Sequence, residues 1–354
     1  MSRPYTARDQ GLEPHGWIGR GTPWNYIEGD IQTMTMVTRA ITAGILPQEY
    51  ARTLEHDRCT LTDRRLTGVY RRAKEIPFDD SSRIIFFSDC HRGDNSRADM
   101  FSANQGLFLH ALSHYYHAGF TYVELGDGDE LWQNRRFRDI QRAHRPVFDL
   151  LHRFDRQDRL HLVVGNHDIQ RRQQDRVEKE GIIAQEGLIL RHSRTGQRIF
   201  CVHGHQADFV SDGFSTVGRP LVRYLGRPAR LLGLGRGSVW SDEPSARTTI
   251  ERQVIDWLRE QTMKIERRIV RWVRNHHQIV VCGHTHHPVC ATRGAPAYFN
   301  TGSCTQAGCI TGLEIQDGEI RLVKWSNRAS GTQGNAQPIE RHLLAPPRKL
   351  CLVG

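Results

Sequence analysis

The chain has 354 residues, of which 38% are hydrophobic and 25% charged, and its formal net charge is +10. This is the composition of a soluble globular protein with one or two domains, and no apolar run approaches the roughly 18 residues of a membrane span. The first residues also lack the apolar segment of a signal peptide, so we expect a cytoplasmic protein. The basic excess favours anionic partners such as nucleotides, phospholipids or nucleic acid.

The first part of the chain, residues 1–80, is predicted to be an N-terminal helical extension. Apolar residues recur with helical spacing over residues 34–43 and 47–74. The simpler interpretation is a helical element that packs on the main domain, and the alternative is an arm that binds a partner.

Residues 81–325 alternate short apolar runs with helical patterns, which predicts an α/β domain, either doubly wound or a sandwich. Helices are expected over residues 98–118 and 137–154. Five apolar runs end in polar residues, at positions 84–87, 122–125, 160–164, 199–202 and 279–282. Because ligands of such folds bind beyond the carboxyl ends of the strands, we expect the polar residues there to share one site.

Residues 206–277 interrupt this alternation and are predicted to form a helical insertion. Its segment 218–237 mixes five arginines with leucines and glycines, which suits an anionic amphiphile or a membrane surface. A long helix is expected over residues 246–275. The insertion is either a lid over the substrate or a helix that simply packs on the domain.

The end of the chain contains a predicted hairpin, with Asp317-Gly318 between apolar runs at 312–316 and 319–325. Residues 326–354 are rich in Gly, Gln and Pro and are predicted to be a flexible tail.

The polar residues after the five runs are ligand types for transition metals. They are carboxylates, an amide and imidazoles, which suit Mn, Fe, Zn or Co better than Ca. Two such ions about 3.5–4 Å apart can neutralise a phosphate ester and supply a nucleophile at neutral pH. The candidate ligands are Asp89, His91, Asp127, Asn166, His203, His284 and His286.

These stretches resemble the calcineurin-like metallophosphoesterases. The family pattern stands here as Asp89-Cys-His91, Gly126-Asp127, Gly165-Asn-His-Asp168, His203 and Gly283-His-Thr-His286. The resemblance covers residues 83–325 and implies a four-layer αββα sandwich with two divalent ions, for which Mn is expected first.

The resemblance also implies a role for each residue. Asp89, His91 and His286 would hold one ion, Asn166, His203 and His284 the other, and Asp127 would bridge them. A metal-bridging hydroxide would attack phosphorus in line. His167 would stabilise the transition state and protonate the leaving oxygen, and Asp168 would orient His167.

Several neighbouring residues leave alternatives open. His205 competes with His203 as a ligand, and we favour His203 because it follows the last apolar residue of its strand. Asp129 and Glu130 are expected to cap or hydrogen-bond their loop. Arg92 either binds a substrate phosphate or forms a surface ion pair. His287 is expected to be a loop residue.

The substrate is less sharply indicated. The stretches Glu130-Leu-Trp132, His203-Gly-His-Gln206 and 298–302 resemble the branch that contains UDP-2,3-diacylglucosamine hydrolase, which implies a lipid-linked pyrophosphate and contact with the inner membrane face. This chain departs from that branch at His167, where an Arg is usual, at Ser303-Cys304 and in its N-terminal extension.

The alternatives are a phosphomonoesterase such as a protein Ser/Thr phosphatase, or a phosphodiesterase or nuclease. Nucleic acid is not the expected partner, because the basic residues are dispersed along the chain. A non-catalytic scaffold is the remaining alternative.

Overall fold

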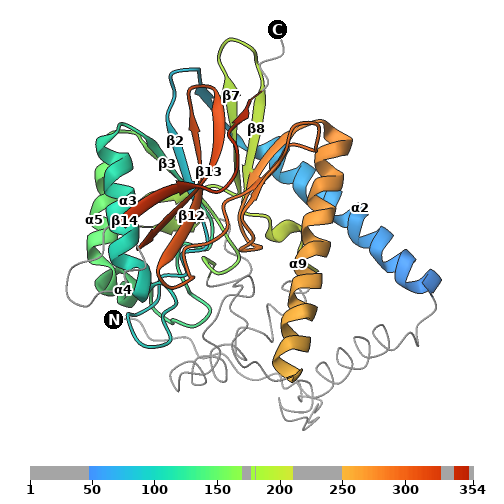
Figure 1. Ribbon diagram of the computed structural model, residues 1–354, viewed down its shortest axis with the longest axis horizontal. Coiled ribbons are helices and arrows are strands. Elements are labelled where there is room, and N and C mark those ends of the chain that lie inside the picture. Colours follow the sequence, from blue (N-terminus) through green and yellow to red (C-terminus); the bar gives the residue numbers. More distant parts are fainter. Residues whose placement is uncertain (1–47, 170–176, 180, 210–248, 328–338, 351–354) are drawn as a thin grey trace, which may run out of the picture. The chain divides into compact units, whose positions relative to one another are not determined.

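The computed structural model of the chain describes residues 48–169, 177–179, 181–209, 249–327 and 339–350. The chain divides into two compact units, residues 1–54 and 55–354. Within the first unit only the beginning of helix α2 (Gln48–Arg72) is described. The second unit contains two large β-sheets and the remaining helices (Figure 1). Among the described residues, no helix combines the length and the apolar character needed to cross a membrane.

The first sheet has the strand order β14-β13-β12-β2-β3-β4, and β15 also pairs with β13. Its central strands β2, β3 and β4 are parallel. The strands are β2 (Ile84–Phe87), β3 (Thr121–Leu125), β4 (Leu160–Val163), β12 (Cys309–Gln316), β13 (Glu319–Asn327), β14 (Ile339–Leu343) and β15 (Arg348–Lys349).

The second sheet has the strand order β1-β7-β8-β9-β11-β10, in which β8, β9 and β11 are parallel. Its strands are β1 (Lys74–Phe78), β7 (Gly187–His192), β8 (Arg198–Val202), β9 (Ile279–Cys282), β10 (Val289–Cys290) and β11 (Tyr298–Asn300). A separate two-stranded sheet pairs β5 (Val177–Lys179) with β6 (Ile182–Ala184).

The apolar runs form strands because both faces of each sheet are covered. Side chains alternate across a strand, so a strand buried on both sides is apolar at most positions. Along β2, Ile85 and Phe87 pack against helices, whereas Ile84 and Phe86 pack against the other sheet. The continuous apolar runs of the sequence therefore follow from the sandwich itself.

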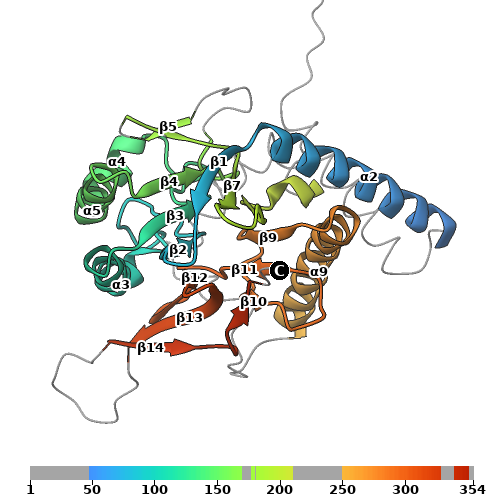
Figure 2. The same cartoon turned by 90° about the horizontal axis from the view of Figure 1, so that it is seen from above.

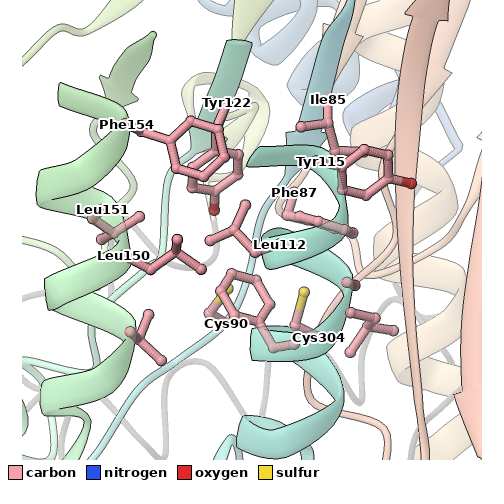
Figure 3. Close-up of a cluster of buried hydrophobic side chains, with 14 of the residues drawn as sticks. Ile85, Phe87, Cys90, Leu112, Tyr115, Tyr122, Leu150, Leu151, Phe154 and Cys304 are labelled. Carbon is pink, nitrogen blue, oxygen red and sulfur yellow. The ribbon is translucent and has the colours of Figure 1, made fainter. Parts of the chain in front are cut away.

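Helices cover the outer face of each sheet. On the first sheet, Tyr115 packs against Phe87 (Figure 3). On the second sheet, Leu66 of α2 and Trp272 of α9 belong to one buried cluster with strand residues. The helices are α3 (Gln105–His117), preceded by the short 3₁₀ helix η1 (Ser102–Asn104), α4 (Phe137–Ala143), α5 (Arg145–Asp155) and α9 (Thr249–His276). The layers are helix, sheet, sheet and helix (Figure 2), which confirms the predicted sandwich.

Two predicted helices differ from those observed, and both differences have local causes. The pattern over 137–154 forms two helices that meet at His144, because Pro146 lies in the first turn of α5 and cannot donate a backbone hydrogen bond. The pattern over 98–118 becomes α-helical only at Gln105. Before it, the Asp99 carboxylate accepts backbone N–H groups of Asn95, Phe101 and Ser102 and thereby stabilises a loop.

The predicted hairpin is confirmed. Gln316 pairs with Glu319, and Asp317 and Gly318 both have positive φ, as a type I′ turn requires.

Both ends of the predicted central domain need correction. Strand β1, which we assigned to the extension, pairs with β7 along its whole length. Strands β14 and β15, which we assigned to a flexible tail, pair with β13. The predicted helix at 34–43 and the arginine-rich segment 218–237 lie outside the described residues.

Candidate metal centre

The five strand ends meet, as predicted, and their loops are joined by backbone hydrogen bonds. The N–H of Asp89 donates to the carbonyl of Gly126 at 3.0 Å, and the N–H of His91 donates to that of Asp127 at 2.9 Å. The N–H of Gly283 donates to the carbonyl of His203 at 3.0 Å. These bonds join loops within each sheet, and the N–H of His284 donates to Oδ2 of Asp89 at 2.9 Å, which joins the loops of the two sheets.

A first group of side chains converges on one point. The Oδ1 atom of Asp89 lies 3.1 Å from Nε2 of His286 and 3.9 Å from Nε2 of His91. The two Nε2 atoms are 3.3 Å apart. Ligand atoms that surround one ion at about 2.1 Å lie roughly 3.0–3.5 Å from one another, so this spacing suits a single ion.

A second group lies beside the first and shares Asp127 with it. The Oδ2 atom of Asp127 is 3.2 Å from Nε2 of His203 and 3.9 Å from Nε2 of His91. Asp127, His203 and His284 each offer a ligand atom within 4.8 Å of the others. Asp127 is thus positioned between the two groups.

A buried, unpaired oxygen shows that the site fits a cation. Among the described residues, Oδ1 of Asn166 is buried without a hydrogen-bond partner. Oδ1 of Asp89 faces Nε2 of His286 at 3.1 Å, and Nε2 of His203 faces Oδ2 of Asp127 at 3.2 Å. The other ring nitrogen of His203 lies 2.7 Å from the carbonyl oxygen of Leu125 and donates to it. A buried acceptor without a donor is costly, and a divalent ion would satisfy it.

Carboxylates orient two further imidazoles. Nδ1 of His91 is 3.1 Å from Oε2 of Glu130, and Nε2 of His284 is 3.0 Å from Oδ2 of Asp208. Metal-bound histidines usually donate their second N–H in this way. These bonds leave Nε2 of His91 and Nδ1 of His284 as the atoms that can bind an ion.

The backbone of the site is strained. The described residues include nine non-glycine residues with positive φ, and five of them are predicted ligands. Such residues persist only where the surroundings enforce them, and they gather at functional sites. The five are Asp89, His91, Asp127, His284 and His286.

Two glycines of the sequence pattern are required because ligand side chains approach their backbone too closely for a Cβ atom to fit. A Cβ at Gly165 would lie 2.1 Å from Oδ1 of Asp127, and one at Gly283 would lie 2.6 Å from Oδ2 of Asp89. Any side chain at either position would displace a predicted ligand.

The clustered carboxylates shift the histidine pKa values. Burial lowers the pKa of His91, but hydrogen bonding to Glu130 and the charge of Asp127 outweigh burial and raise it to about 9. Burial likewise lowers the pKa of His203, and Asp127 raises it to about 9. The ligand set therefore favours positive charge at its centre.

Glu130, and not Asp168, orients His167. Oε1 of Glu130 lies 2.9 Å from Nδ1 of His167. Asp168 instead accepts the backbone N–H groups of Gly165 and Asp127 and the ammonium of Lys179. The predicted contact between Asp168 and His167 is wrong, because the Asp168 carboxylate is occupied in holding the loop backbone. The side chain of His167 is 19% exposed.

Arg92 requires a second correction. Its side chain is fully buried, and its guanidinium donates to Glu124 at 2.7 and 2.9 Å and to Asp129 at 2.8 Å. It therefore neither reaches a substrate nor forms a surface ion pair. Lys179 lies 2.8 Å from Asp129, and these residues form a buried charge cluster behind the site.

The structure also shows where His205, His287 and Glu130 lie. Burial and then the neighbouring His203 and His284 lower the pKa of His205 to about 3, so it is a neutral, half-buried residue. His287 contacts Glu266 of α9 at 3.0 Å. Glu130 caps its loop, as expected, by accepting the N–H groups of Trp132 and Gln133.

Sequence reasoning missed several contributors to the site. From the sequence, Glu130 is expected only to cap or hydrogen-bond its own loop. Its position three residues after Asp127 could have indicated that it faces the same centre. The partnership of Asp208 with His284 and that of Lys179 with Asp168 join distant segments, and neither has a local sequence signal.

Comparison with known proteins gives one family match. A family model described as calcineurin-like phosphoesterase matches residues 82–288, more than half of the chain. No curated protein sequence matches the chain.

Similar solved structures include vacuolar protein sorting 29 from Cryptosporidium parvum, with 13% identity, coverage of 75% of this chain and 98% of that chain, and a TM-score of 0.36. A Vps29 double mutant from Entamoeba histolytica has 16% identity, coverage of 74% and 99%, and a TM-score of 0.34. At such TM-scores these structures add no argument about this chain.

Proposed function

The chain belongs to the calcineurin-like phosphoesterase family, and from this premise we propose that it is a phosphoester hydrolase that uses two divalent metal ions. The observation that carries the proposal is the convergence of two ligand groups on either side of Asp127, beside the buried and unpaired Oδ1 of Asn166. A buried amide oxygen without a donor is costly, and a cation would satisfy it.

We assign the ligands as the sequence pattern suggests. Asp89, His91 and His286 would hold the first ion, and Asp127 would bridge to the second. The second ion would also take Asn166, His203 and His284. This mixture of carboxylate, imidazole and amide suits Mn first, and also Fe, Zn or Co. Bound there, the ions would neutralise phosphoryl oxygens and acidify a water molecule.

His167 is the proposed catalytic acid. Its Nδ1 faces the Glu130 carboxylate, so Nδ1 carries a proton and Nε2 is the nitrogen left for a substrate. Its ring lies beside that of His91, with centroids 4.6 Å apart, so the imidazole is adjacent to the first ligand group. From there Nε2–H can donate to a phosphoryl oxygen and pass its proton to the leaving oxygen.

The histidine favours one class of substrate. An alcohol is a poor leaving group unless it is protonated, whereas a nucleoside monophosphate leaves readily as an anion. A proton donor held by a carboxylate is therefore most useful for esters of alcohols. We propose a phosphomonoester or phosphodiester of an alcohol as the first substrate class, with a phosphoprotein among the monoesters.

A UDP-linked acyl-sugar is the second candidate. It is supported by the stretch Glu130-Leu-Trp132, which resembles that branch; Glu130 contacts His91, and Trp132 contacts Asn166. The net charge of +10 suits either anionic substrate, and the second one would bring the protein to a membrane surface.

The test is side-by-side hydrolysis by the Mn-loaded protein of phenyl phosphate, a phosphodiester and a UDP-linked acyl-sugar. Preference for an alcohol ester would support the first class, and selective cleavage of the UDP-lipid would establish the second. No turnover of any of them by protein that contains two ions per chain would reject hydrolysis and support a scaffold.

A further inference from the structure

The indole of Trp132 lies flat on the imidazole of His167. The ring centroids are 4.1 Å apart and the planes are inclined by only 20°. Trp132 is itself fixed, because it is buried and its Nε1–H donates to the carbonyl of Asn166 at 2.8 Å. The indole thus joins the proposed acid to the backbone of a proposed metal ligand.

The other contacts of His167 hold its backbone and Nδ1 but still allow the imidazole ring to tilt. Nδ1 is held by Glu130, and the backbone N–H donates to Oδ1 of Asp127 at 2.7 Å. A ring held by one hydrogen bond can still pivot out of its plane about that bond. The indole of Trp132 blocks this motion on one face, and His91 approaches the ring edge-on at an interplanar angle of 81°.

We propose that Trp132 is a positioning residue that keeps Nε2 of His167 aligned with the leaving oxygen and so sets how poor a leaving group the enzyme accepts. The inference rests on the proposed function. A displacement of about 1 Å at a reacting group can reduce turnover by about 10²-fold, so the orientation of the ring has large consequences.

The reaction step explains why the effect should depend on the leaving group. His167 enters the step protonated on both ring nitrogens. As the oxygen of the attacking water or hydroxide forms its bond to phosphorus, the P–O bond to the leaving group breaks, and its electron pair goes to the leaving oxygen. That oxygen takes the proton from Nε2 of His167, and the imidazole is left neutral, with its Nδ1 proton still hydrogen-bonded to Glu130. Phenol needs this proton more than 4-nitrophenol does, because 4-nitrophenolate is a much more stable anion.

The experiment compares Trp132→Leu and Trp132→Phe with the wild type on phenyl and 4-nitrophenyl phosphate, or on the matching diesters if those are preferred. Trp132→Leu should lower kcat for the phenyl ester by about 10- to 100-fold and for the nitrophenyl ester by less than about 3-fold. Trp132→Phe keeps an aromatic face, so kcat should stay within about 3-fold of the wild type for both esters. Equal losses on both esters would mean that Trp132 only supports the fold, and would overturn the inference.

The matched control is Trp272→Leu. Trp272 also stacks on a histidine, His276, with centroids 4.5 Å apart, and its indole N–H bonds to Thr67, away from the ligand groups. The ratio of the two kcat values should be unchanged in this variant. A changed ratio there would show that any lost tryptophan alters selectivity, which would also overturn the inference.

A spectroscopic measurement tests the stacking of Trp132 on His167 without requiring turnover. The indole ring current should shift the His167 ring protons upfield in NMR spectra of the wild type and of Trp132→Phe, and the shift should vanish in Trp132→Leu. An absent shift in the wild type would contradict the stacked arrangement. A present shift in a wild type that hydrolyses no phosphoester would support the positioning while rejecting the proposed function.

Discussion

Oε1 of Glu130 accepts a hydrogen bond from Nδ1 of His167 at 2.9 Å, while Oε2 of the same carboxylate lies 3.1 Å from Nδ1 of His91. One buried side chain therefore orients both a proposed metal ligand and the proposed acid. Burial raises the pKa of Glu130, but His167 and His91 outweigh burial and hold it well below its usual value. The carboxylate is ionised at neutral pH and can serve both rings.

Glu130→Gln tests this shared role. Glutamine keeps the size of the side chain but loses the charge, and its amide has only one oxygen acceptor for two ring N–H groups. We expect kcat to fall by roughly 10- to 100-fold, the scale of losing a carboxylate that orients a metal-bound histidine. Steady-state kinetics with metal analysis by mass spectrometry would measure this. The control is Asp149→Asn, which removes an exposed partner of Arg145 on α5. Unchanged turnover in Glu130→Gln would contradict the assigned role.

Asn166→Ala and His167→Ala should separate binding from chemistry. Loss of the unpaired Asn166 oxygen should weaken the second ion and turnover together. Loss of His167 should leave two ions per chain and reduce kcat by about 10²-fold or more, because only a proton donor or electrostatic group is removed. Equilibrium dialysis gives the metal content and initial rates give kcat. Equal loss of metal in both variants would show that His167 is a ligand.

Metal binding should release protons. In the metal-free protein the pKa values of His91 and His203 are about 9, raised by the surrounding carboxylates. Both imidazoles are therefore protonated at pH 7, and an ion can bind only when they lose those protons. From pH 7 to pH 9 the apparent affinity should rise by up to about tenfold per pH unit for each displaced proton. Calorimetry in two buffers of different ionisation enthalpy would count the protons. A metal affinity that is independent of pH over this range would refute the expectation.

Lys179→Met should destabilise the fold more than an ordinary lysine substitution. The ammonium lies 2.7 Å from Asp168 and 2.8 Å from Asp129 in a buried cluster, so its removal leaves carboxylates uncompensated. We expect a loss of about 3–5 kcal/mol in the free energy of unfolding, measured by urea denaturation. Lys264→Met is the control, because Lys264 forms an i,i+4 pair with the exposed Glu260 on α9. That variant should change stability by less than about 1 kcal/mol. Similar losses in the two variants would show that the buried cluster has no special role.

The sequence by itself predicted the five strands that precede the proposed ligands and the order in which those residues occur. Continuous apolar runs such as 84–87 can be recognised because a strand buried on both faces is mostly apolar. The proposed ligands can be recognised because they lie just after such runs, and parallel strands end at one edge. The glycines at 165 and 283 belong to the same local pattern, since a Cβ at either would strike a ligand.

Only the tertiary structure decided which charged residue serves which partner. Asp168 is next to His167 in the chain, yet its carboxylate turns to backbone N–H groups and Lys179, while Glu130 reaches the histidine from another loop. Arg92 follows a ligand by one residue and is nevertheless buried between Glu124 and Asp129. The physical reason is that a buried charge must be paired wherever its partner lies, and packing of distant segments sets that pairing rather than proximity in the chain.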